Sequence, residues 1–173
     1  MSKLFRYVAG LAVSLAFVSG ASAQKLTDAE TDFLKQAAEN GHVEVESAKL
    51  AQKKASSPQV KSFAKQMVAD HTKAGKELMA LAKKKGIEVP SEPSVLQKGK
   101  LKLLSIQDGR DFDKAYAEQI GVEAHQETIE LFQEGAQQAK DPEVKAFANK
   151  TLPTLKQHLG MAEKLKASVD KQK

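Results

Sequence analysis

Two stretches of this 173-residue chain match each other, and this repeat constrains the fold more than any other feature. Residues 56–66 read SSPQVKSFAKQ, and residues 140–150 read KDPEVKAFANK. In each stretch a polar capping residue precedes a proline, which suits the first position of a helix. Apolar residues then recur with helical spacing, as they also do before each break. The repeat therefore predicts two helical hairpins.

Signals for the ends of the helices agree with this interpretation. Thr27 with Glu30 three residues later is a capping box that starts the first helix. Gly86 suits the end of the second helix. Residues 87–108 contain two prolines and predict a crossover that carries a short helix near 94–106. No stretch alternates apolar and polar residues as a strand does, so the sequence predicts an all-α, ferritin-like four-helix bundle of two helical hairpins joined by a long crossover.

The first 23 residues have the pattern of a secretory signal. Two basic residues precede a mainly apolar run of twelve at 7–18, and Ala21-Ser22-Ala23 fits a small-residue cleavage site. The run is shorter than the about 20 residues that an ordinary membrane-spanning helix needs. We therefore expect residues 1–23 to be a signal peptide and residues 24–173 to form a single domain. This domain is expected in the periplasm, soluble and without an integral membrane segment.

Composition narrows the partners and the metal ligands. The whole chain has a net charge of +5, and removal of Lys3 and Arg6 leaves 25 basic against 22 acidic residues, or +3. Lysine and glutamate are interspersed without a basic block, so nucleic acid is not an expected partner. The chain has no cysteine. An exported form therefore has no disulfide, and any metal site must use histidine, carboxylate or methionine.

Four polar residues with ligand chemistry lie on the apolar stripes of the four predicted helices, one on each: Glu44, His71, His125 and His158. Glu44 stands 14 residues before Pro58, and His71 stands 13 after it. In an antiparallel hairpin, equal distances from the turn mean equal height, here about 20 Å at 1.5 Å per residue. The other two histidines stand 17 before and 16 after the second break proline. Each hairpin thus presents a level pair to the core, and the crossover decides whether the pairs share one level.

The other polar residues near these four are expected to be less important. His42 lies two positions before Glu44 and is expected to face water, and Asp70 lies on the polar side of its helix. Met67 and Met161 each stand one turn from a histidine. They are either core filling or thioether neighbours that would favour copper.

The four stripe residues support two interpretations. A buried neutral histidine is often only structural, hydrogen-bonded to the backbone or to a neighbour. Three histidines and a carboxylate, level in pairs, favour a metal site instead. Burying Glu44 unpaired would cost several kcal/mol, which a divalent ion held with three imidazoles would remove. The expected cofactor and partner is one divalent transition metal, and these ligands suit zinc, copper or iron.

Four motifs of the chain resemble a widespread family of small exported bacterial proteins: FAKQMVADH (63–71), FDKAY (112–116), the histidine of EAHQETIELF (123–132) and LPTLKQHL (152–159). That family is catalogued as a domain of unknown function and is often labelled "predicted outer membrane protein". The resemblance covers residues 27–167 and implies a ferritin-like bundle and export, but no activity. Ferritins hold two irons with Glu-x-x-His motifs, whereas Val68 and Leu155 stand three residues before the corresponding histidines here. One ion is therefore expected rather than two.

The sequence as a whole predicts an exported four-helix-bundle protein that binds one transition-metal ion through Glu44, His71, His125 and His158. Its role would be sequestration or protection of the envelope from stress. The alternative is a non-metal structural or interaction protein of the cell envelope. A metal-dependent oxidoreductase is a third hypothesis and requires an open coordination position. No residue is assigned as catalytic.

Overall fold

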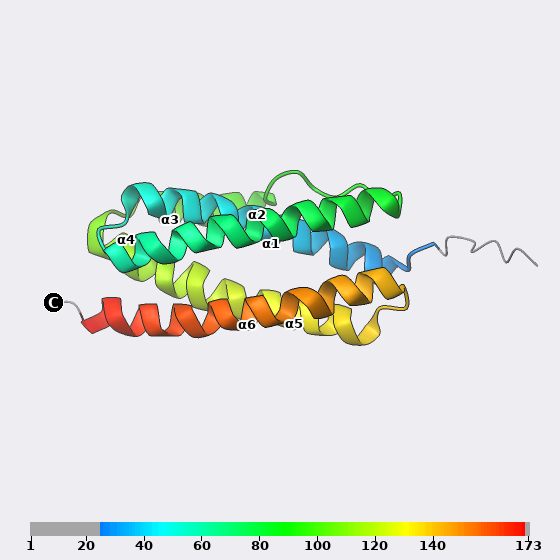
Figure 1. Ribbon diagram of the computed structural model, residues 1–173. Coiled ribbons are helices and arrows are strands. Elements are labelled where there is room, and N and C mark those ends of the chain that lie inside the picture. The colour runs from blue at the N-terminus through cyan, green and yellow to red at the C-terminus, as the bar shows by residue number, and fades with distance from the viewer. Residues whose placement is uncertain (1–24, 172–173) are drawn as a thin grey trace, which may run out of the picture.

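The computed structural model describes residues 25–171, which form an all-α bundle (Figure 1). The elements in chain order are α1 (Asp28–Lys54), α2 (Pro58–Lys84), α3 (Val95–Ser105), α4 (Gly109–Ala115), the π-helix η1 (Tyr116–Glu123), α5 (Ala124–Gln138) and α6 (Pro142–Lys171). Because α4, η1 and α5 follow one another without a break, they form one long helix, the third of the bundle. The predicted four-helix bundle of two hairpins with a long crossover is confirmed. The predicted signal peptide lies outside the described residues.

The helix ends follow from local chemistry. Thr27 Oγ1 accepts a hydrogen bond from the Glu30 backbone N–H at 3.2 Å, and Glu30 Oε2 accepts one from the Thr27 N–H at 2.8 Å. This is the predicted capping box. At the first break, the Ser57 side chain caps α2 and Pro58 is its first residue. Gly86 follows α2 with a φ of 70°, a conformation that favours glycine.

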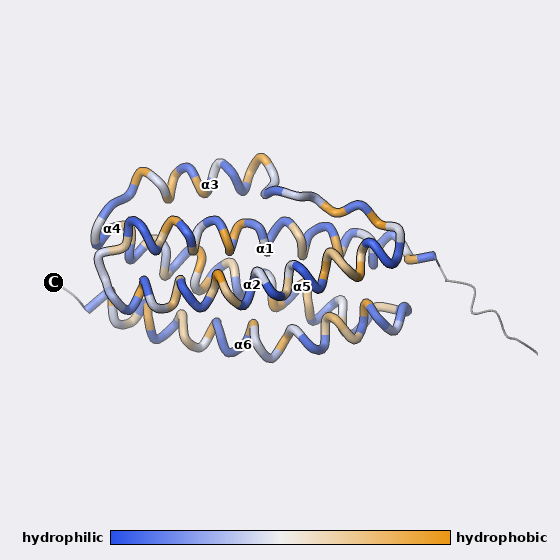
Figure 2. Tube along the Cα trace, turned by 45° about the horizontal axis from the view of Figure 1, so that its top comes forward, coloured by the Kyte–Doolittle hydropathy of each residue, from blue (hydrophilic) through white to orange (hydrophobic). Residues whose placement is uncertain are grey.

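The crossover places α3 outside the four-helix bundle, along α1 (Figure 2). Ser94 and Gln97 form a second capping box at its start. Leu104 is the buried residue of α3, and Leu101 is half-buried against the core. This helix is therefore held to the bundle by a narrow contact, and most of its surface faces outward.

The apolar core consists of two clusters. One contains Phe63, Met67 and Tyr116, and the other contains Leu34, Phe132 and Phe147. On α2, on the continuous helix of α4, η1 and α5, and on α6, the predicted histidines stand between the residues of the first cluster and those of the second. A polar layer thus divides the core near the middle of the bundle. Within residues 25–171, no helix is long and apolar enough to cross a membrane.

Candidate metal centre

The structure brings the four predicted site residues together from four helices. Glu44 comes from α1, His71 from α2, His125 from α5 and His158 from α6, and their exposed fractions are 2, 7, 0 and 1 %. The ring centroids of the three histidines are 5.5, 5.2 and 5.5 Å apart in pairs. Both hairpin pairs therefore lie at one level, which the sequence alone left open.

The three imidazoles face one another closely enough to share an ion. Each can offer one ring nitrogen such that all three nitrogens lie within 4.8 Å of one another. An ion at the centre of such a triangle lies at most about 2.8 Å from each nitrogen, compared with the about 2.0–2.1 Å of a zinc–imidazole bond. Side-chain shifts of under about 1 Å would close this three-histidine cluster round one ion.

Hydrogen bonds determine which nitrogen two of the rings offer. His125 Nδ1 lies 2.9 Å from the carbonyl oxygen of Ile120, which only accepts, so Nδ1 carries the proton and Nε2 has the free lone pair. His158 Nε2 lies 3.0 Å from Asp70 Oδ2. Because the carboxylate accepts this bond, His158 keeps Nδ1 for another partner.

Glu44 holds the third ring. Its Oε2 contacts His71 Nδ1, which leaves His71 Nε2 available. The other oxygen of the carboxylate, Oε1, accepts a hydrogen bond from Thr128 Oγ1 at 3.4 Å, and Thr128 Oγ1 accepts one from Asn40 Nδ2 at 3.3 Å. Glu44 is thus oriented from both sides. That Glu44 is a direct fourth metal ligand stays a prediction, because in the structure its carboxylate contacts His71 Nδ1, the nitrogen that the ion would not use.

The unpartnered polar atoms of the core gather at this layer. Within residues 25–171, five buried side-chain atoms have no hydrogen-bond partner: His71 Nε2, His125 Nε2, His158 Nδ1, Glu44 Oε2 and Tyr116 Oη. Glu44 Oε2 nevertheless lies against His71 Nδ1. Leaving a buried polar group unsatisfied costs about 1–3 kcal/mol. The three ring nitrogens are the same ones that the tautomers leave free, and a metal ion would satisfy all three.

The charges of the site depend on one another. Burial raises the pKa of Glu44, but the neighbouring imidazoles, His71 first, outweigh burial and hold this pKa below its ordinary value. Burial lowers the pKa of His71, but the contact with Glu44 outweighs it and raises that pKa. Burial also lowers the pKa of His158, and Asp70 offsets only part of this shift. Glu44 is therefore ionised and places one negative charge beside the three-histidine cluster.

The π-helix explains how His125 obtains its backbone partner. The Ala124 N–H donates to the carbonyl of Gln119, five residues earlier, rather than to that of Ile120 as in an α-helix. The Ile120 carbonyl is thus left for His125. Gly121 allows α6 to approach this segment, because a Cβ atom there would lie 3.0 Å from Ala162 Cβ. π-Helical turns are rare and frequently occur at functional sites.

A pocket of about 240 Å³ reaches the three-histidine cluster between α1 and α2. Its walls include Glu44 and His71 together with Gly41 and Gly75. A Cβ added at either glycine would meet nothing within 4 Å, so both face open space. His42, which was expected to face water, is half-buried and lines this pocket. The pocket reaches the cluster at His71 and Glu44.

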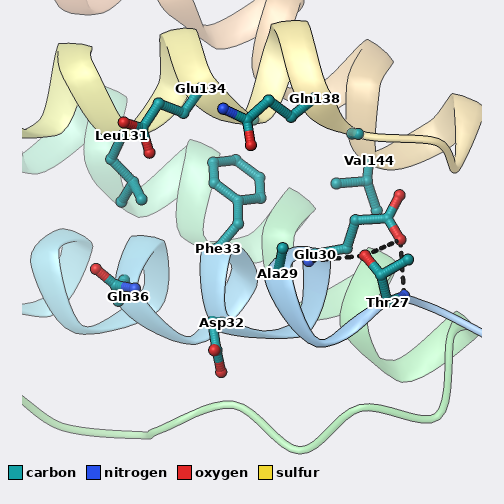
Figure 3. Close-up of a pocket in the computed structure, with 12 residues that line it drawn as sticks. Thr27, Ala29, Glu30, Asp32, Phe33, Gln36, Leu131, Glu134, Gln138 and Val144 are labelled. Atoms are coloured by element: carbon teal, nitrogen blue, oxygen red, sulfur yellow. Dashed lines mark hydrogen bonds between the residues drawn. The ribbon is translucent and has the colours of Figure 1, made fainter.

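A second pocket of about 210 Å³ contains none of the cluster residues (Figure 3). It lies beside the start of α1 and is lined by Thr27, Glu30 and Phe33 among others. The hydrogen bonds of Glu30 there serve the cap of α1 and the turn before α6, since Glu30 Oε1 accepts from the Lys140 and Asp141 N–H groups at 2.7 and 2.6 Å. This pocket is therefore a structural feature of the bundle end.

Three partners of the four site residues were not found by reasoning from the sequence. Asp70 was expected on the polar side of its helix, but its carboxylate orients His158. Thr128 and the Ile120 carbonyl were not singled out at all. Thr128 stands one turn after His125, and this spacing could have indicated that it lies on the same face of the helix as the site. Nothing in the sequence indicates that the Ile120 carbonyl bonds to His125, because this bond depends on the π-helical register of the backbone.

Comparisons with known proteins identify a family and a shared fold, but they assign no chemical activity. The model of a family described as "Domain of unknown function (DUF4142)" matches residues 16–165. A solved DUF305 fragment from Deinococcus radiodurans is similar with a TM-score of 0.74 and 14 % identity, over 84 % of this chain and 99 % of that one. A conserved hypothetical protein from Mycobacterium tuberculosis is similar with a TM-score of 0.63 and 12 % identity, over 80 % and 91 %. No curated protein matches the chain. At these identities the solved structures show a shared fold alone.

Proposed function

This chain belongs to the DUF4142 family of domains of unknown function, and we propose that it binds one divalent transition-metal ion in the core of its bundle. Two observations carry the proposal: each histidine of the cluster can offer a ring nitrogen within 4.8 Å of the other two, and each has one buried ring nitrogen without a hydrogen-bond partner. The other nitrogen of each ring lies beside an acceptor, so each ring in its neutral form keeps one nitrogen lone pair for an ion.

The proposed ligands are His71 Nε2, His125 Nε2 and His158 Nδ1. Metal-bound histidines usually donate their other N–H to a carboxylate or a carbonyl, and this is the role of Glu44, Asp70 and the Ile120 carbonyl. Three neutral imidazoles suit zinc, copper or iron. The ionised Glu44 offsets part of the charge of the ion. Three histidine ligands would leave a further coordination position for Glu44 or for a molecule that enters by the pocket between α1 and α2, which His71 and Glu44 line.

The biological role that fits such a site is sequestration of a metal ion or protection of the cell envelope from metal stress. A buried three-histidine cluster between two apolar clusters is suited to hold an ion, and the pocket between α1 and α2 gives the ion a way in and out. We further propose that the chain is exported to the periplasm and cleaved after Ala23. Sequencing the N-terminus of protein recovered from the periplasm tests this part: Gln24 as the first residue supports it, and an intact Met1 contradicts it.

The decisive experiment for the metal site uses untagged protein of residues 24–173. After chelator treatment, zinc, copper or iron is added and the melting temperature is measured. An ion that binds only the folded state raises the free energy of unfolding in proportion to RT ln(1 + [M]/Kd). We expect at least one of the three ions to raise the melting temperature, and we expect chelator to reverse the rise.

Matched variants test whether the metal-dependent rise in melting temperature comes from the three-histidine cluster. His71→Ala, His125→Ala and His158→Ala should each weaken the metal-dependent rise, whereas His42→Ala, on the wall of the same pocket, should retain it. If the cluster is purely structural, as in a non-metal envelope protein, the wild type gains nothing from metal. No response of the wild type, or an equal loss in His42→Ala, would refute metal binding at this site.

A further inference from the structure

The exposed apolar side chains of the bundle are concentrated on α3 and the residue that follows it. Five large apolar residues are exposed within residues 25–171, and four of them lie here: Val95 at 89 %, Leu96 at 73 %, Leu103 at 65 % and Ile106 at 67 %. Leaving this much apolar surface in water on an 11-residue helix is unfavourable. A concentrated apolar patch of this kind marks an interaction site.

The four side chains form one outward stripe. At about 100° per residue, Leu104 points toward the bundle and Ile106 points nearly opposite to it. Val95, Leu96 and Leu103 lie within about 100° of one another on the same outer side. Figure 2 shows α3 as the outermost helix, with apolar segments along it. We call these four exposed residues the α3 apolar stripe.

Lysines flank the α3 apolar stripe on both edges. By the same angular spacing, Lys98 and Lys102 lie along one edge and Lys100 along the other. The sequence of α3, VLQKGKLKLLS, contains no acidic residue. Lys98 pairs with Glu92 at 2.7 Å, whereas Lys100 and Lys102 take part in no ion pair of the described residues. The outer face of α3 is thus apolar in the middle and has lysines at its margins, of which Lys100 lines a pocket together with Glu118, Glu123 and Glu127.

We propose that α3 docks the protein on an anionic lipid surface. In such a complex the α3 apolar stripe enters the boundary between headgroups and acyl chains, and the lysines reach lipid phosphates. A short apolar stripe with lysine margins is typical of interfacial helices, whose binding depends on both burial and charge. The attachment is peripheral and reversible, which agrees with the lack of a spanning helix within residues 25–171.

Charge argues against a second copy of the chain as the occupant. In a two-fold pairing through the stripe, the lysines of one α3 would lie against the lysines of the other, and like charges would oppose association. An anionic bilayer offers negative charge at the margins and apolar contact in the centre. None of the four stripe residues belongs to the three-histidine cluster, so this proposal does not depend on metal binding.

The test is cosedimentation of residues 24–173 with vesicles of phosphatidylglycerol and phosphatidylcholine, compared with phosphatidylcholine alone. We expect binding to the anionic vesicles that falls at least about tenfold in high salt or without phosphatidylglycerol. The double variants Leu96→Ser with Leu103→Ser, and Lys100→Glu with Lys102→Glu, should each lose at least about tenfold in binding. Met79→Ser and the pair Lys61→Glu with Lys65→Glu, exposed on α2, serve as matched controls and should bind as the wild type does.

A second measurement shows which residues contact the vesicle, without abolishing the binding. The chain has no cysteine, so Leu103→Cys carries a single polarity-sensitive fluorophore, and Met79→Cys is its control. Anionic vesicles should shift the emission of the first to the blue and leave the second unchanged. Absence of wild-type binding, equal losses in the α2 controls, or no shift at position 103 would overturn the proposal. A dimer in solution that Leu96→Ser with Leu103→Ser dissociates, without vesicle binding, would overturn it in favour of a second copy.

Discussion

His125 Nδ1 lies 2.9 Å from the carbonyl oxygen of Ile120, five residues earlier on the same helix. This contact is available because the π-helical register directs the Ala124 N–H to Gln119 instead. The bond selects the tautomer of His125 and aims Nε2 at the other two histidines. A local departure from α-helical geometry thus determines the chemistry of a side chain in the core.

Asp70 should tune the metal affinity through His158. Asp70→Asn keeps an acceptor near His158 Nε2 but removes the negative charge that favours its N–H donation. We expect metal affinity, measured by competition with a chromophoric chelator, to fall by about 10–100-fold. Asp32→Asn, at an exposed position about three turns from Glu44 on α1, is the control. An unchanged affinity in Asp70→Asn would show that Asp70 has no such role.

Met67 should be core filling rather than a metal ligand. It is 1 % exposed and packs in the cluster that contains Phe63 and Tyr116. Met67→Leu conserves volume, so it should cost less than about 1.5 kcal/mol in the free energy of unfolding and leave metal preference unchanged. Denaturant unfolding and metal titration measure the two quantities. A selective loss of copper binding would instead assign the thioether to the site.

Two glycines on the bundle should respond to alanine with opposite signs. A Cβ at Gly75 meets nothing within 4 Å, so Gly75→Ala should stabilise the protein by about 0.5–1 kcal/mol through helix propensity. A Cβ at Gly135 would lie 2.8 Å from the ring of Phe33, so Gly135→Ala should be destabilising by about 1–3 kcal/mol. Figure 3 shows the Phe33 ring among the side chains that line the pocket beside the start of α1. Equal effects in denaturant unfolding would contradict this packing.

Stability below neutral pH should depend on Glu30. Burial raises the pKa of Glu30, but hydrogen bonds from Asp141, Thr27 and Lys140 outweigh it and lower the pKa below its ordinary value of 4.5. A lowered folded pKa contributes stability that is present above about pH 4.5 and lost as pH falls through the folded pKa.

Glu30→Gln should therefore destabilise the protein by about 1–2 kcal/mol at pH 7. Its deficit relative to the wild type should shrink as the pH falls below about 4. Urea unfolding at a series of pH values checks this, with the exposed Glu46→Gln as control. A deficit that stays constant with pH would show that the charge of Glu30 is not responsible.

Much of the fold could be predicted because its signals are local. The capping box of Thr27 and Glu30, the serine and proline before α2, and the glycine after it each act within a few residues. The four site residues could be found for a similar reason, since helical rise converts distance from a turn into height. Counting residues from each break proline is enough to pair Glu44 with His71, and His125 with His158.

The sequence by itself determined the two hairpins, the stripes that they bury and the polar residues on those stripes, because helix periodicity and turn chemistry depend only on neighbours in the chain. The tertiary structure alone decided that both pairs share one level, that Asp70 and Thr128 support them, and that η1 directs His125. It also decided that the apolar side of α3 faces outward. These features depend on how the crossover docks one hairpin on the other, and the energies of that docking come from contacts between residues far apart in sequence.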